Sequence, residues 1–188
     1  MKRTSILFLV FISLIFVSSC KEETLPKPQG FLRLEYPLPQ YEDANIDCPF
    51  TFGKNVYSVT KNKKDCDFVL EYPHMKATVF LSYKPVNNNM KELLTDAQAF
   101  TYRHVVKAAN IIEQPYVNPD KKVYGMYYEV GGDAASGTQF YLTDSIRNFV
   151  LGSVYFNVKP NADSLLPASH YLKNDIRLLI ESFEWKSY

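Results

Sequence analysis

Apolar residues in two segments of this chain recur at steps of three and four residues, the spacing of an amphipathic helix. The first segment begins at Met90 and continues to Val105, and Asn89 followed by Glu92 predicts a capping box at its start. The second lies between Ser164 and Glu184, and Pro167 falls in its first turn, where proline is tolerated. Its apolar face is predicted to consist of Leu172, Ile176, Leu179, Ile180 and Phe183.

The other segments of the chain are short runs rich in β-branched and aromatic residues, bounded by turn signals. Strands are expected at residues 49–52, 55–59, 67–72, 76–83, 111–117, 122–130, 138–143 and 149–158. Pro73-His74 and the segment 144–148 predict turns, and Gly131 to Gly137 predicts a loop. Strands followed by a helix, twice over, predict an α+β fold, an antiparallel sheet with two main helices packed on it.

The N-terminus has the pattern of a secretory signal peptide. Lys2 and Arg3 precede an apolar run from 6 to 17, which is too short for a transmembrane helix of about 18 or more residues. The following Val17-Ser18-Ser19-Cys20 resembles the lipobox of bacterial lipoproteins. This resemblance implies that residues 1–19 are removed and that Cys20 carries acyl chains such as palmitate. The alternative is an ordinary cleaved signal with Cys20 beside the cut by chance.

Residues 20–45 are predicted to be a tether. Four prolines in this segment disfavour regular structure and favour an extended backbone. Its apolar residues, however, could dock part of it on the domain: Phe31, Leu32, Leu34 and Tyr36. Residues 46–188 are then expected to form a single α+β domain, large enough for a hydrophobic core.

The net charge of the chain excludes some classes of partner. Without Lys2 and Arg3, 19 basic residues stand against 20 acidic ones, a net charge of −1, so neither nucleic acid nor an anionic lipid surface is an expected partner.

If Cys20 is acylated, Cys48 and Cys66 remain as a pair in an exported protein. They are candidates for a disulfide, which on the chain-entropy model would stabilise by roughly 3 kcal/mol. Two buried free thiols are the alternative.

The sequence contains no complete catalytic or metal-binding motif among the patterns considered below. Ser58 and Lys61 have the Ser-x-x-Lys spacing of penicillin-binding enzymes, but they lie in a strand-like segment without the companion motifs. The Gly131–Gly137 loop lacks the Gly-Lys-Ser/Thr ending of a P-loop. The histidines, His74, His104 and His170, are scattered, and they form no metal-binding motif. No enzyme activity, cofactor, metal or small-molecule substrate is therefore expected.

Three short motifs suit an envelope protein. Lys21-Glu22-Glu23 is similar to the acidic export signal of Bacteroidota surface lipoproteins, or it is simply the soluble base of the tether. Asp144-Ser145-Ile146 and Asp163-Ser164-Leu165 match the O-glycosylation acceptor pattern of that phylum, which makes Ser145 and Ser164 possible glycosylation sites. The alternative for these two is structural, a turn at the first and a helix N-cap at the second.

Several motifs in order along the chain resemble the gliding-motility lipoprotein GldD family of Bacteroidota. They are Pro26 to Leu34, Cys48 to Phe52, Lys76 to Thr78, Leu81 to Pro85, Ala134 to Ser136, Gln139 to Ser145, Tyr155 to Asn157 and Asn161 to Leu165. The resemblance implies an envelope protein that is needed for gliding and for the associated type IX secretion machinery, and the outer membrane is its expected location. The resemblance also implies that other gliding lipoproteins are partners of this protein, and that the protein maintains one of them.

No catalytic residue is carried over from this family. The element order is also similar to that of PsbP/Mog1-like α+β domains, which says nothing about function. The leading hypothesis is a non-catalytic, lipid-anchored scaffold or stability factor whose aromatic-rich sheet or 131–137 loop meets a protein. A surface lipoprotein that binds a ligand or glycan in a Tyr-lined concavity is the alternative, and a hydrolase is a third.

Overall fold

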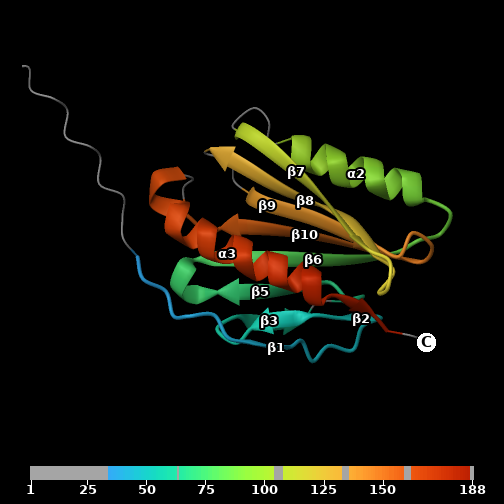
Figure 1. Ribbon diagram of the computed structural model, residues 1–188, viewed down its shortest axis with the longest axis horizontal. Coiled ribbons are helices and arrows are strands. Elements are labelled where there is room, and N and C mark those ends of the chain that lie inside the picture. The colour runs from blue at the N-terminus through green and yellow to red at the C-terminus, as the bar shows by residue number, and fades with distance from the viewer. Residues whose placement is uncertain (1–33, 63, 104–107, 133–135, 159–161, 187–188) are drawn as a thin grey trace, which may run out of the picture. The chain divides into compact units, whose positions relative to one another are not determined.

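The computed structural model describes residues 34–62, 64–103, 108–132, 136–158 and 162–186. This part of the chain is dominated by an antiparallel sheet of seven strands with two helices packed on it (Figure 1), which confirms the predicted α+β class. From edge to edge, the strands are β4 (Val59–Asn62), β5 (Phe68–Tyr72), β6 (Ala77–Pro85), β10 (Asn148–Phe156), β9 (Ser136–Thr143), β8 (Val123–Gly132) and β7 (Ala108–Asn118).

The sheet consists of two meanders joined at their last strands. The first is β4–β5–β6 and the second is β7–β8–β9–β10, and β6 pairs antiparallel with β10 from Ala77 opposite Phe156 to Pro85 opposite Asn148. Helix α2 (Met90–Tyr102) connects the meanders, and α3 (Ala162–Ser182) follows the second one. The predicted order of strands, helix, strands and helix is therefore confirmed.

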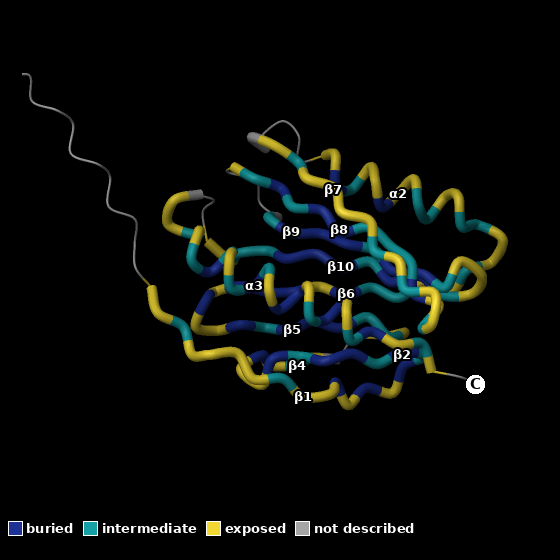
Figure 2. The backbone as a smooth tube through the Cα atoms, viewed as in Figure 1, coloured by how far each residue is buried: buried dark blue, intermediate teal, exposed yellow. Residues whose placement is uncertain are grey.

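Four short strands flank this sheet. They form two small ladders, β1 (Tyr41–Asp43) with β3 (Gly53–Asn55) and β2 (Phe50–Thr51) with β11 (Glu184–Trp185). The predicted Pro73-His74 turn is a 3₁₀ turn, η1 (Pro73–Met75), and Lys76 leaves it in the left-handed region with φ 48°. Figure 2 shows the most deeply buried backbone along the central strands and exposed backbone along β7.

The hydrophobic core lies between the sheet and α3. All five apolar residues predicted for the inner face of this last helical segment are buried: Leu172, Ile176, Leu179, Ile180 and Phe183. Phe183 lies just beyond α3, and its ring stacks on those of Phe50 and Phe52 at 5.2 and 6.3 Å between centroids. Each large side chain buried in this way contributes about 1.5–3 kcal/mol. The core therefore holds the short β2 strand against the C-terminal end of α3.

An ion-pair cluster fixes α3 over β8. The carboxylate of Glu129 accepts from Lys173 Nζ and from Arg177 Nη2, each at 2.8 Å. Burial raises the pKa of Glu129, but the hydrogen bonds and charges of the two cations outweigh it and hold the pKa below its ordinary value. The pairs cross between two elements, so they fix the position of the helix along the strand.

A buried polar network attaches β1 and β3 to α3. Asp175, which is 4% exposed, accepts from Tyr41 Oη and from Asn55 Nδ2, both at 2.8 Å. Tyr72 hydrogen-bonds to the same carboxyl group, and Asn55 Nδ2 also donates to Tyr171 Oη at 2.9 Å. Burial raises the pKa of Asp175, and the hydrogen bonds it accepts offset only part of that rise.

The opposite face of the sheet carries α2. Strand residues alternate between the two faces, so Val79 and Val154 point to the α3 core, while Phe80 and Ser153 point to the α2 side. Helix α2 lies on this face through the buried Thr101, whose Oγ1 donates to Gln139 Oε1 of β9 at 2.8 Å. At the other end of the helix, Thr143 of β9 contacts the Met90 sulfur at 3.9 Å.

The predicted capping box at α2 is wrong. Asn89 is the N-cap residue, but its side chain makes no hydrogen bond to the helix. Its Oδ1 accepts from the backbone N–H of Asn87 at 2.8 Å instead. The competing turn before the helix therefore takes the acceptor that a capping box requires. The helix ends at Tyr102, and residues 104 and 105 of the predicted segment lie outside the described residues.

The described domain includes residues that were predicted as tether. Tyr41–Asp43 pairs with β3, and Ala44 is buried in the core, so ordered structure begins before residue 46. Tyr36 docks as expected, with its ring 5.6 Å from that of Tyr171 in an edge-on contact. Leu34 is 44% exposed, and Phe31 and Leu32 lie outside the described residues. Pairing with β3, which local composition does not reveal, orders this segment.

Candidate functional site

The predicted pairing of Cys48 with Cys66 is present as a disulfide with a Cα–Cα distance of 5.7 Å. Cys48 is buried next to β2, and Cys66 lies in the turn that precedes β5. Asp65 and Cys66 both adopt positive φ, 56° and 61°. Non-glycine residues in this region cost free energy and persist where the surrounding structure holds them. The disulfide is thus positioned to hold this turn against the edge of the core.

We expect the Cys48→Ser/Cys66→Ser double variant to lose about 3 kcal/mol of unfolding free energy, because the unfolded chain then gains back the entropy of an open loop. Urea unfolding of oxidised wild type, reduced wild type and the variant measures this loss. The variant and the reduced wild type should unfold at the same urea concentration. The state of the Cys20 side chain should not change this midpoint. Equal midpoints for oxidised and reduced protein would contradict the prediction.

The two candidate glycosylation serines lie at exposed positions. Ser145 is in the β9–β10 turn with φ 67°. Asp144 organises that turn, because its Oδ1 accepts from the N–H groups of Ile146, Arg147 and Asn148 at 2.7–2.9 Å. Burial raises the pKa of Asp144, but these backbone donors outweigh it and leave the pKa lowered. Ser164 lies within the first turn of α3 and is not its N-cap, since the helix begins at Ala162.

Other predicted positions are only partly described. Cys20 and residues 133–135 of the glycine-rich loop lie outside the described residues. The flanking glycines of that loop are described: Gly131 and Gly132 belong to β8, and Gly137 belongs to β9. Within the described ranges, no group of three or more His, Cys, Asp or Glu side chains could hold a metal ion. Among those same residues, no helix is long and apolar enough to cross a membrane.

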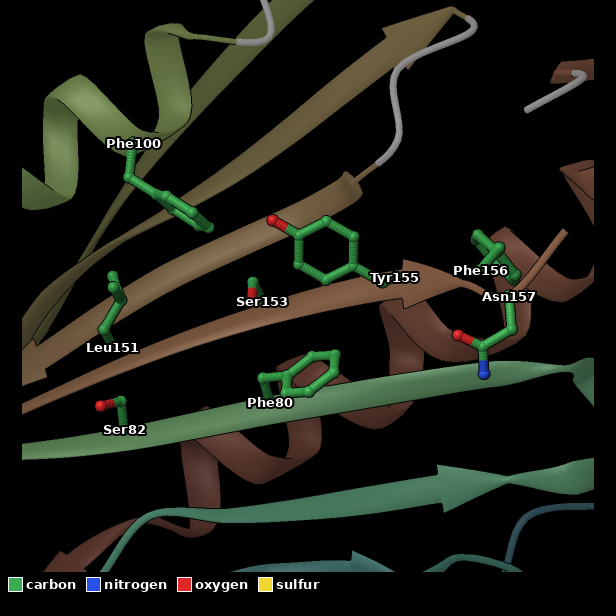
Figure 3. A pocket seen from close by; sticks show the side chains of 8 residues that line it. All are labelled: Phe80, Ser82, Phe100, Leu151, Ser153, Tyr155, Phe156 and Asn157. Carbon is green, nitrogen blue, oxygen red and sulfur yellow. The ribbon is translucent and has the colours of Figure 1, made fainter. Parts of the chain in front are cut away.

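The structure reveals an open apolar hollow on the α2 side of the sheet (Figure 3), which the sequence reasoning missed. Its volume is about 520 Å³. The floor consists of β6 and β10 side chains, and α2 contributes one wall through Phe100 (Figure 3). The lining residues are Phe80, Ser82, Phe100, Leu151, Ser153, Tyr155, Phe156 and Asn157.

Aromatic rings dominate the hollow. Phe80 is 38% exposed, and its ring meets that of Tyr155 edge-on at 5.7 Å. Burial raises the pKa of Tyr155, and the positive charge of Arg103 opposes this rise. The Arg103 guanidinium itself lies 5.5 Å from the centre of the Phe100 ring, at the end of α2. A large ring left more than one-third exposed beside these side chains makes this face a candidate contact surface.

Two polar side chains of the hollow already have hydrogen-bond partners. Ser82 Oγ donates to Asp67 Oδ1 at 2.8 Å, and Asn157 Nδ2 donates to Thr78 Oγ1 at 3.1 Å. Ser153 is almost buried, with 6% of its surface exposed. The hollow therefore offers an incoming group mainly apolar and aromatic surface, to which Tyr155 adds a hydroxyl group (Figure 3).

One sequence signal could have indicated this surface. Residues 77 to 81 of β6, Ala-Thr-Val-Phe-Leu, are nearly continuously apolar and do not alternate with polar ones. Such a run is typical of a strand that is covered on both faces. Here α3 covers one face, and on the other face Phe80 remains exposed because α2 lies over β9.

Comparisons with known proteins identify one family. The family model described as "Gliding motility lipoprotein GldD" matches residues 21–185, which is nearly the whole chain after the predicted signal peptide. The match includes both helices, all seven strands of the main sheet and the two cysteines of the disulfide. A search of curated proteins found no match to this chain.

Proposed function

We propose a function for this chain on the premise that it belongs to the gliding motility lipoprotein GldD family, whose model matches residues 21–185. Membership implies a lipid-anchored envelope protein with a role in gliding motility. Beyond this, the chain acts as a non-catalytic scaffold or stability factor for partner lipoproteins of the gliding and type IX secretion apparatus. Its acyl chains on Cys20 hold it in the outer membrane.

The observation that carries this proposal is the apolar hollow over β6 and β10. Phe80 and Tyr155 expose aromatic surface there, next to Phe100 of α2. Aromatic side chains at the centre of a contact patch supply much of the binding energy of protein–protein interfaces. A partner that covers the hollow would remove this surface from water, which supports both association and protection of the partner from degradation.

The alternative, a ligand- or glycan-binding lipoprotein, uses the same hollow. The aromatic rings of the hollow favour ligand binding, since sites for small ligands are mostly apolar concavities with a few well-placed polar groups. Against it, Ser82 and Asn157 are already hydrogen-bonded within the domain, so the surface left for a ligand is mainly apolar and aromatic. The protein-partner proposal fits the hollow better.

The test is complementation of a deletion strain with wild type and with Phe80→Asp. A carboxylate at this exposed position should leave the fold intact but weaken burial of the hollow, because an unpaired charge resists desolvation. We expect Phe80→Asp to reduce spreading and the level of the affected partner lipoprotein by roughly tenfold, about 1.4 kcal/mol of binding free energy.

Val117→Asp on β7 is the matched control, because Val117 is 67% exposed and lies outside the hollow. This variant should spread like wild type. Unchanged spreading, secretion and partner-lipoprotein levels in the deletion strain itself would overturn the scaffold proposal. If Phe80→Asp reduces spreading and an excess of soluble glycan restores it, the ligand- or glycan-binding alternative would be favoured.

A further inference from the structure

Helix α2 leaves room for a second helix on its face of the sheet. Both described ends of α2 contact β9, through Thr101 with Gln139 and Met90 with Thr143. The next strands in the sheet are β10 and then β6. Adjacent strands lie about 4.8 Å apart, so β6 runs about 10 Å from the line of α2. This is the distance at which two packed helices normally lie, about 8–10 Å between axes.

A helix packed beside α2 at this distance would therefore lie directly over β6. Phe80 projects from β6 at that position, and Leu151 and Tyr155 project from β10 into the seam between the two helices (Figure 3). The length fits as well. From Leu151 to Asn157 the floor spans six residue-to-residue steps, about 20 Å of extended chain, which corresponds to about 13 residues of α-helix.

The charge at one end of the hollow favours an occupant with an acidic residue there. Arg103 at the end of α2 and Lys84 of β6 are exposed, and neither contacts a carboxylate within the described ranges. The carboxylates nearby are mostly committed: Asp67 accepts from Ser82, and Glu71 pairs with Lys61. Asp96 and Glu92, about two and three turns before Arg103 on the same helix, are exposed exceptions. The local charge at the Phe100 end of the hollow is that of Arg103, whose guanidinium lies 5.5 Å from the centre of the Phe100 ring.

We propose that the hollow binds an amphipathic α-helix of a partner protein, with its apolar face on Phe80, Leu151 and Tyr155 and a carboxylate near Arg103. This inference deepens the proposed function and rests on it. The added helix completes a two-helix layer over β6, β10 and β9, so the sheet is covered on both faces along its central strands. Such helix-in-groove binding places apolar anchors at steps of three, four and seven residues.

The experiment uses the photoreactive residue p-benzoylphenylalanine at position 80 or 155 of the full-length, lipidated chain in living cells. Both positions are aromatic in the wild type, so the probe is tolerated. After irradiation, the crosslinked residues of the partner are identified by mass spectrometry. We expect them to fall on one segment of one protein, at spacings of three, four or seven residues. The probe at position 117 is the negative control.

A charge reversal tests the acidic contact. Arg103→Glu should lower the crosslink yield roughly three- to tenfold, because an attractive pair becomes a repulsive one at the edge of the interface. Lys91→Glu, on the exposed side of the same helix, is the matched control and should leave the yield unchanged. Reversing the partner's carboxylate to lysine should restore the yield with Arg103→Glu.

Other outcomes overturn the inference. Crosslinks at two-residue spacing would indicate an extended strand, and crosslinks to a second copy of this chain would indicate a homodimer. Crosslinks only to lipid or glycan, or none at all, would show that no protein helix occupies the hollow. These results differ from failure of the proposed function, which would appear as normal spreading and normal partner levels in the deletion strain.

Discussion

Replacing Asp175 with alanine should lower the free energy of unfolding by about 4 kcal/mol, because it leaves several buried donors without an acceptor. Tyr41 Oη and Asn55 Nδ2 both lie 2.8 Å from this carboxylate, and Tyr72 is a third partner. The loss should be concentrated at the β1–β3 ladder, which this network attaches to α3. Urea unfolding measures the total, and hydrogen exchange should show early opening of β1.

The neighbouring Asn174 provides the matched control for this prediction. It is exposed on the same helix, so Asn174→Ala should change stability by no more than about 0.5 kcal/mol. If Asp175→Ala unfolded at the same urea concentration as Asn174→Ala, the network would not stabilise the domain. Asp175→Asn, which keeps the size and one acceptor, should cost less than the alanine variant.

The pH dependence of Asp175 has a definite sign. Its pKa is raised in the folded protein, so the folded state binds this proton more tightly than the unfolded state. Stability from this group is therefore fully present below the unfolded pKa of about 3.9, and it falls as the pH rises through the folded pKa. Glu129 and Asp144 have lowered pKa values and act in the opposite direction, losing stability as the pH falls.

Comparing wild type with Asp175→Asn isolates the contribution of Asp175, because the other carboxylates are common to both proteins. The cost of Asp175→Asn should be larger at pH 4 than at pH 7. A cost that increases with pH would mean that the buried carboxylate is stabilised in its charged form, contrary to the raised pKa.

Features with a strong local period were predictable from the sequence. The last helix has a 3.6-residue period over several turns, so its buried face followed directly from Leu172 to Phe183. The hairpin at Pro73 and the turn at 144–148 carry their own turn residues. In these cases the local preference of the chain and its tertiary packing agree, which is what makes sequence reasoning succeed.

The errors lie where pairing between segments, and not the preference of one segment, decides the structure. β1 pairs with β3 at 10 to 14 positions, and β11 pairs with β2 across more than 130 positions. Two- or three-residue strands leave no periodic pattern, and their partners are chosen by the core around Phe50 and Phe183. The Asn89 capping box failed for a local reason, because the backbone N–H of Asn87 donates to its side-chain oxygen.

The candidate site was the least predictable part. Phe80 and Leu81 are adjacent in sequence and equally apolar, yet one is exposed in the hollow and the other is 2% exposed in the core. Which face stays open depends on α2 lying over β9 and not over β6. That choice is made by contacts such as Thr101 with Gln139, which join residues 38 positions apart. The periodicity of the sequence alone cannot show which face of β6 stays exposed.

Replacing Cys20 with alanine should abolish gliding while leaving the domain folded. Two or more acyl chains give stable anchoring, at about 0.8 kcal/mol for each buried methylene. The rest of the mature chain has a net charge of −1 and offers no basic segment to hold it at an anionic membrane. The variant should therefore leave the membrane fraction. To avoid an uncut signal, residues 1–19 are exchanged for an ordinary secretory signal in the same strain.

The fold should survive this change because the described domain begins beyond Cys20 and its disulfide uses Cys48 and Cys66. Circular dichroism and the urea midpoint of the purified variant should match those of wild type. Ser19→Ala keeps the aliphatic-small-small pattern before Cys20, so it is the matched control and should glide normally. If the secreted, unlipidated protein restored gliding, the anchor would serve delivery alone. Because a scaffold acts by holding partners in one place, loss of gliding with a fully folded domain is what the proposed function requires.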